Sequence, residues 1–191
     1  MIWSEFIGAH EGQTAYVVGL GESWGAYQDG MPGTTYGVND CGRNFTPDYL
    51  VCIDNWFRFS SERWKHIKFS EARNIFSNHD WKELPVARRD ALVRIALSSE
   101  KGSVLRDKFH IDTSFTSVFV AANIALLMGH TTIAICGSDF TNHHLDRQLG
   151  TILRHFKEFR NNAERIGVYV VSIVEDSPLN TVLDYTNLKH Q

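Results

Sequence analysis

Several sequence features that define whole classes of proteins are absent or scarce in this chain. Its 191 residues include only Cys41, Cys52 and Cys136, an odd number without C-x-x-C spacing. Such cysteines are typical of reduced, buried thiols in a cytoplasmic protein rather than of a disulfide scaffold. No apolar run approaches the ~20 residues that span a bilayer, and residues 1–12 lack the charged and apolar regions of a signal peptide.

An excess of positive charge and low-complexity sequence are also absent. Nineteen lysines and arginines stand against 22 aspartates and glutamates, giving a formal net charge of −3 and a pI near 6.3. A protein that coats nucleic acid needs a basic excess, so that class is disfavoured. With 43% hydrophobic residues and no repeats, residues 1–191 are predicted to form one globular domain. Residues 98–112 mix charges with glycine, and they are predicted to form a loop that could move over a binding site.

The nucleotide-binding motifs with long, fixed spacings are missing. No G-x-x-x-x-G-K-[ST] P-loop occurs in the chain. The first glycine turn, GLGES at residues 19–23, is followed by Trp24 where a G-x-G-x-x-G fingerprint has its third glycine. The next strand is closed by Asn39 and not by the acidic residue of an NAD site. NAD and P-loop chemistry are therefore disfavoured.

What the sequence does contain is a series of short apolar runs that end on glycine or on a polar side chain. The runs lie at residues 16–18, 34–38, 49–53, 74–77, 93–97, 132–136 and 168–173. Runs of this length, bounded by turn residues, are typical of buried strands. The first three end at Gly19, Asn39 and Asp54, which parallel strands would bring to one sheet edge and one crevice. The alternative is that Asn39 and Asp54 only cap turns.

Helical segments alternate with the strands in the second half of the chain. The hydroxyl-rich residues 113–117 precede an apolar helix at residues 118–128, which Gly129 closes. A basic amphipathic helix is predicted at residues 149–166, and a shorter helix at residues 55–67, where many aromatic side chains are expected to pack in the core. This order predicts a Rossmann-like, doubly wound, mostly parallel α/β sheet.

The strand ends and the hydroxyl-rich helix start are the candidate nucleotide site. Glycine lets backbone N–H groups approach a phosphate, and the start of a helix attracts anions. The predicted nucleotide-binding residues are Gly19, Leu20, Gly21, Glu22, Ser23, Asn39, Asp54, Ser114, Thr116, Ser117, Gly137, Asp139 and Phe140. His143 and His144 follow closely, and histidine suits a general base because its pKa lies near neutrality. The alternative is a pair of solvated loop histidines.

Several of these motifs resemble the bacterial sialyltransferases of glycosyltransferase family 42. GLGESW, GVND and CID after the first three strands correspond to its amino half, where a G-N-G-P-S-like turn and a strand-end asparagine hold the nucleotide of CMP-sialic acid. Ser117-Val118, residues 127–130 and residues 136–140 correspond to its patterns S-G-V, A-L-G-Y and G-x-D-F-Y. The resemblance implies a CMP-sugar-dependent glycosyltransferase that requires no cofactor, with His143 or His144 matching the catalytic histidine.

Other functions fit the same residues. The framework is also similar to archaeal-type 6-hydroxymethylpterin diphosphokinases and to unassigned phage and bacterial proteins. Mg²⁺ could bind through the carboxylates of Asp54 and Asp139, with or without Asp40, and bridge ATP phosphates, as diphosphoryl transfer requires. His143, His144 and Asp139 could instead bind a transition metal. A non-catalytic nucleotide-binding module would keep the crevice without turnover. The acceptor and a homo-oligomeric state are left open.

Overall fold

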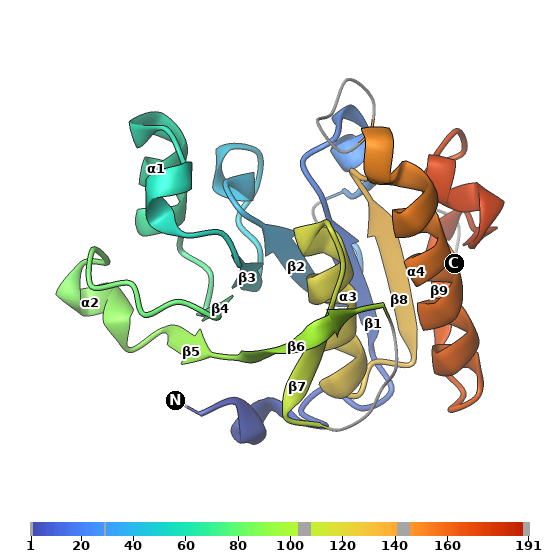
Figure 1. Ribbon diagram of the computed structural model, residues 1–191, viewed down its shortest axis with the longest axis horizontal. Helices are drawn as coiled ribbons and strands as arrows, with labels where there is room; N and C mark the ends of the chain where they lie inside the picture. The colour runs from blue at the N-terminus through green and yellow to red at the C-terminus, as the bar shows by residue number, and fades with distance from the viewer. Residues whose placement is uncertain (1, 29, 103–107, 141–145, 189–191) are drawn as a thin grey trace.

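The computed structural model describes residues 2–28, 30–102, 108–140 and 146–188, and its centre is a parallel sheet (Figure 1). Within these ranges the sheet has eight strands. They are β1 (Thr14–Val18), β2 (Thr34–Val38), β3 (Tyr49–Val51), β4 (Asn74–Ser77), β5 (Leu92–Arg94), β8 (Thr132–Cys136), β9 (Tyr169–Ser172) and β10 (Asp184–Tyr185). Their bounds confirm the predicted strands at residues 34–38, 74–77 and 132–136.

The strand order is β10-β9-β8-β1-β2-β3-β4-β5, and each neighbouring pair is parallel. From β1 the chain adds β2 to β5 on one side and then returns to place β8 on the other side of β1. The direction of winding therefore reverses between β1 and β8. In open α/β sheets this topological switch point is where ligands bind, at the carboxyl ends of the strands.

Both faces of the sheet are covered, which confirms the doubly wound α/β prediction. Alternate strand residues belong to separate apolar clusters: Ile133 and Ile135 of β8 pack on one face, Ala134 and Cys136 on the other. The first face is covered by α3 (Ser117–Leu127), which contacts β1 and β2, and by α4 (Leu149–Glu164), which contacts β9 (Figure 1). The second face packs against Ile67 of α1 (Ser61–Lys68).

The helix α3 is buried on every side, which explains its mostly apolar sequence. Residues 117–126 are all buried, and a helix with no polar face belongs in a protein core. The Thr116 hydroxyl caps its start by accepting the N–H of Val118 at 3.3 Å. Its end is followed by Gly129 at φ 96°, a left-handed conformation suited to glycine. Local chemistry thus fixes both ends of the helix that reaches the switch point.

Two segments differ from their predictions. The single strand expected at residues 93–97 is divided between β5 and β6 (Ala96–Lys101), and β6 forms a separate parallel pair with β7 (His110–Thr113). Strands therefore occupy both ends of the loop predicted at residues 98–112, and residues 103–107 lie outside the described ranges. The helix expected at residues 55–67 is divided into a 3₁₀ turn (Trp56–Arg58) and α1, because Ser60 caps α1.

A short helix, α2 (Val86–Arg89), precedes β5 in the chain. All three cysteines are free and buried, as predicted, and burial raises the pKa of the Cys136 thiol to about 12. Among the helices in the described ranges, none combines the length and the apolar character needed to cross a membrane.

Candidate functional site

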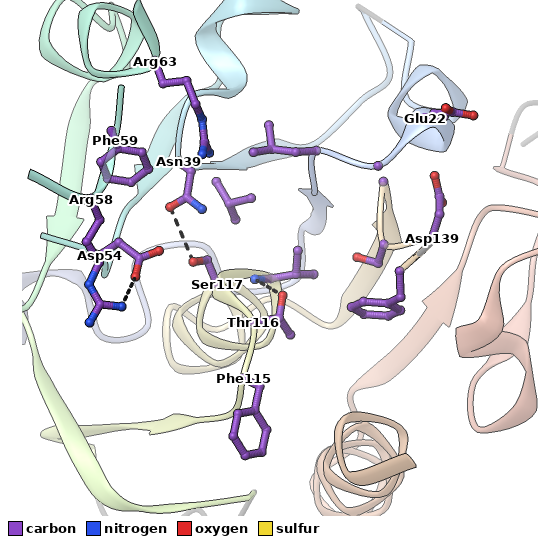
Figure 2. A pocket seen from close by; sticks show the side chains of 17 residues that line it. Glu22, Asn39, Asp54, Arg58, Phe59, Arg63, Phe115, Thr116, Ser117 and Asp139 are labelled. Atoms are coloured by element: carbon purple, nitrogen blue, oxygen red, sulfur yellow. Dashed lines mark hydrogen bonds and ion pairs between the residues drawn. The ribbon is translucent and has the colours of Figure 1, made fainter. Parts of the chain in front are cut away.

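A cavity of about 510 Å³ opens at the carboxyl ends of β1, β2, β3 and β8, beside the start of α3 (Figure 2). Its lining residues are Leu20, Gly21, Glu22, Val38, Asn39, Asp54, Arg58, Phe59, Arg63, Phe115, Thr116, Ser117, Val118, Gly137, Ser138, Asp139 and Phe140. The structure thus brings together ten of the predicted nucleotide-binding residues. Gly19, Ser23 and Ser114 are not in the lining, and each has a different role.

The glycines of the first turn serve close packing between β1 and β8. A Cβ atom on Gly19 would lie 2.1 Å from the carbonyl oxygen of Gly137, so only glycine fits there. The Gly19 N–H donates to the carbonyl of Cys136 at 2.9 Å, and the Gly21 N–H to that of Gly137 at 2.8 Å. These two N–H groups, expected to face a phosphate, are therefore already bonded within the protein.

Ser23 clamps this turn onto Asp139. The Ser23 N–H donates to one carboxylate oxygen of Asp139 at 2.8 Å, and the Ser23 hydroxyl donates to the other. The same hydroxyl accepts the N–H of Gly137 at 3.1 Å. Both carboxylate oxygens of Asp139 thus have a protein partner, although the side chain lines the cavity. Ser23 fixes the wall of the site without facing it.

The start of α3 and the end of β2 meet in the middle of the cavity (Figure 2). The Ser117 hydroxyl donates to Oδ1 of Asn39 at 3.5 Å, and the Asn39 N–H is held by the carbonyl of Val51 at 3.0 Å. Asn39 has a left-handed φ of 50°, which asparagine tolerates better than most residues. The helix start, two hydroxyls and an amide therefore face one space, an arrangement suited to an anion.

Ser114 turns away from the cavity and towards α4. Its hydroxyl is hydrogen-bonded to Nδ1 of His155 at 2.9 Å, and both residues are buried. The His155 ring also stacks on Phe115, with centroids 6.4 Å apart. Burial lowers the pKa of His155. Of the four hydroxyl residues at positions 113–117, the structure therefore places only Thr116 and Ser117 at the cavity.

Sequence reasoning missed the wall formed by Arg58, Phe59 and Arg63. The Arg63 guanidinium donates to Oδ1 of Asp40 at 3.0 and 2.6 Å, and lies 5.1 Å from the centroid of the Phe59 ring. The Asp40 side chain is 1% exposed. Arg58 is 3.9 Å from a carboxylate oxygen of Asp54. A basic residue four positions after the strand-end aspartate was the available signal, but the prediction for residues 55–67 considered only a helix and its aromatic side chains.

The two predicted catalytic histidines, His143 and His144, lie outside the described residues, and so does Thr141. Phe140, which precedes them, lines the cavity and has a left-handed φ of 54°, a strained conformation for an aromatic residue. Within the described ranges, no group of three or more histidine, cysteine, aspartate or glutamate side chains could hold a metal. Asp54 and Asp139 lie on opposite sides of the cavity (Figure 2).

Comparison with known proteins gives a likeness in fold. No protein-family model matches the chain, and no curated protein does. The sialyltransferase CstII from Campylobacter jejuni, in complex with cytidine-5'-monophosphate, has a TM-score of 0.54 at 10% identity, covering 91% of this chain and 84% of that one. The monofunctional α-2,3-sialyltransferase Cst-I from Campylobacter jejuni gives 0.55 at 13% identity, covering 93% and 81%. CST-II in complex with trisaccharide acceptor and CMP gives 0.53 at 10%, covering 94% and 89%.

Proposed function

We propose that this protein is a transferase that uses a nucleotide-activated donor, and that the donor is a CMP-sugar, as in a glycosyltransferase. The observation that carries the proposal is the cavity at the β1–β8 switch point, with the start of α3 at its centre. Its volume of about 510 Å³ is within the range of about 300–1,000 Å³ typical of small-molecule sites. The likeness in fold to sialyltransferases solved with CMP supports the choice of nucleotide.

The donor phosphate would bind at the start of α3. The hydroxyl of Ser117 and the partial positive charge of the helix end favour an anion there. Asn39, on the facing strand end, would hydrogen-bond the nucleotide through the amide that now contacts Ser117. Removing a negative charge from water is costly, so these groups must replace the lost hydration. They would also stabilise the CMP phosphate as it leaves.

His143 or His144 would act as the general base. It would take the proton of the acceptor hydroxyl while that oxygen forms a bond to the anomeric carbon of the donor sugar. The bond from that carbon to the phosphate oxygen breaks, and its electron pair leaves with CMP. Histidine can do this at neutral pH because its unperturbed pKa is about 6.5. The short connection from Phe140, which lines the cavity, supports this choice of residues.

The Mg²⁺-ATP alternative receives less support from the carboxylates. Asp139 accepts two hydrogen bonds from Ser23, Asp40 is held by Arg63, and Asp54 faces Arg58. A single Mg²⁺ needs its ligand oxygens at about 2.1 Å from the ion, whereas Asp54 and Asp139 lie on opposite walls. Diphosphoryl transfer would therefore require these side chains to move, and glycosyl transfer would not.

The proposal is tested first by thermal shift with CMP, CDP, UDP, GDP and ATP, each with and without Mg²⁺. A ligand that binds only the folded state stabilises it by about 2.7 kcal/mol at 100 times its Kd. For a chain of this size that is a Tm increase of about 5–10 °C. We expect CMP or CDP to give this shift without Mg²⁺. Stabilisation by ATP only with Mg²⁺ would favour the diphosphokinase, and no shift with any nucleotide would refute nucleotide binding.

Turnover then separates the enzyme from a binding module. His143→Ala and His144→Ala are each assayed for CMP release from CMP-sialic acid, with His66→Ala as the matched control. His66 lies on α1 and does not line the cavity. We expect one of the two loop variants to lose activity by at least about 100-fold, the contribution of a general base, while CMP still shifts its Tm. Binding of CMP without turnover in the wild type would indicate a non-catalytic module.

A further inference from the structure

Ser138 has a buried hydroxyl that the described part of the chain leaves without a hydrogen-bond partner. The residue follows β8, is 4% exposed and lines the cavity. Its Oγ has no hydrogen-bond partner among the described residues. An unpaired buried polar group destabilises a protein, and most such groups in native structures are satisfied. A hydroxyl left unpaired on a cavity wall is explained if a ligand supplies the partner.

The other hydroxyls around the cavity differ from Ser138 in this respect. Thr116 caps α3, Ser117 donates to Asn39, and Ser23 bridges Asp139 and Gly137. Each therefore has a structural partner in the free protein. Ser138 also stands at the position that the G-x-D-F-Y pattern leaves open, so the resemblance assigns it no role.

The charges of the cavity indicate which part of a nucleotide Ser138 would contact. Asp139 adjoins Ser138 in the chain, and Glu22 lies at the same end of the cavity, whereas Arg58 and Arg63 lie at the other end (Figure 2). A phosphate beside Asp139 and Glu22 would be repelled, because like charges in a partly buried site interact strongly. A neutral group is not repelled. The acidic end therefore suits the nucleoside. At the other end Arg58 and Arg63 balance Asp54 and Asp40, so the charged remainder of the donor is not repelled there.

We propose that Ser138 is a nucleoside-binding residue: its hydroxyl hydrogen-bonds a neutral polar atom of the cytidine part of the ligand. The proposal rests on the proposed function, because it takes the ligand to be a cytidine nucleotide. It adds a contact that fixes which end of the cavity the nucleoside occupies.

The test is isothermal titration of cytidine and of CMP into the wild type, Ser138→Ala and Ser138→Cys. A neutral hydrogen bond contributes about 0.5–1.5 kcal/mol, which corresponds to a change in Kd of about 2- to 12-fold. We expect both variants to bind more weakly. For each variant, the Kd values for cytidine and for CMP should rise by the same factor, within this range. We also expect the Tm of the free Ser138→Ala protein to equal or exceed that of the wild type, because the substitution removes an unsatisfied group.

Ser77→Ala is the matched control. Ser77 is fully buried at the end of β4, and its hydroxyl accepts the N–H of His79 at 3.1 Å. Its loss should lower the Tm and leave both affinities unchanged, which is the behaviour of a structural serine.

Three results would overturn the proposal. Unchanged cytidine affinity in both Ser138 variants, with CMP still bound by the wild type, would refute the contact and leave the proposed function intact. Weaker binding of CMP alone would place Ser138 at the phosphate and not at the nucleoside. Failure of the wild type to bind either compound would refute the proposed function, and this inference with it.

Discussion

The buried histidine His130 should make the stability of this protein fall sharply as the pH drops from 6.5 to 4. His130 is fully buried at the amino-terminal edge of the sheet, between α3 and β8 and at the opposite end from the cavity. Its Nδ1 is 3.1 Å from the carbonyl of Gln13, which can only accept, so Nδ1 carries the proton. Its Nε2 therefore accepts the hydroxyl of Tyr36 at 2.8 Å. The His10 ring stacks on it at 5.0 Å.

The magnitude follows from the pKa. Burial, the largest influence, lowers the pKa of His130 from 6.5 to about 4. Above pH 6.5 the imidazole is neutral in both the folded and the unfolded chain, and the full stability is present. Between pH 6.5 and 4 the unfolded chain takes up a proton that the folded protein does not, so the free energy of unfolding falls. At 1.36 kcal/mol per pKa unit the loss is about 2 kcal/mol at pH 5 and about 3 kcal/mol below pH 4. Burial lowers the pKa of His10 as well, which adds a loss of the same sign.

The assay is urea denaturation of the wild type and His130→Asn at half-unit steps from pH 4 to pH 8. The asparagine amide can donate to the Gln13 carbonyl, and Met128 Sδ, 3.2 Å from the Tyr36 hydroxyl, remains as that hydroxyl's partner. We expect the variant to be less stable at pH 7, by about 1–3 kcal/mol, because the imidazole leaves a cavity. Between pH 7 and pH 4 the difference in free energy of unfolding should change by about 3 kcal/mol in favour of the variant, so that it disappears or changes sign. A difference that is constant with pH would refute the reasoning.

Two further substitutions test the packing around the site. Gly19→Ala should destabilise the protein by more than about 2 kcal/mol in urea denaturation, because its Cβ would overlap the backbone of Gly137. The matched change Gly150→Ala, in a helix with nothing within 4 Å of the new Cβ, should instead stabilise it by up to about 1 kcal/mol, and equal effects would contradict this. Arg63→Ala should lower the free energy of unfolding by about 2–3 kcal/mol. This is less than the loss on breaking a fully buried ion pair, because the Arg63 side chain is 43% exposed. Removing Asp40 as well should recover part of that loss, and a double variant less stable than the single one would refute the explanation.

The sheet and one edge of the site could be predicted from the sequence because strand ends are local signals. Runs of apolar residues stop where Asn39, Asp54 and Gly137 begin, and all parallel strands present that end to the same edge. The start of α3 was equally local, since Thr116 is a capping residue directly before an apolar segment. These features required no knowledge of which strands are neighbours.

The rest depended on contacts between distant parts of the chain. Ser23 and Asp139 are 116 residues apart, and only the pairing of β1 with β8 brings them together, so their hydrogen bonds could not be predicted. The same pairing occupies the N–H groups of the glycine turn. Arg63 reaches the cavity from α1, which packs on one face of the sheet, and is held there by Asp40 and Phe59. Sequence patterns predict the ends of strands, but not which side chains approach those ends from other elements.

The two edges of the sheet differ in a way that itself indicates a ligand site. At the amino edge, the side chains of His130 and Tyr36 are buried and hydrogen-bonded to each other. At the carboxyl edge, Asn39 and Phe140 have left-handed backbones, at a cost of order 1–3 kcal/mol for Phe140 and less for Asn39, and the Ser138 hydroxyl has no partner among the described residues. A ligand that contacts the Ser138 hydroxyl would offset part of these costs. The carboxyl edge therefore has the features expected of the proposed ligand site, at the expense of the stability of the free protein.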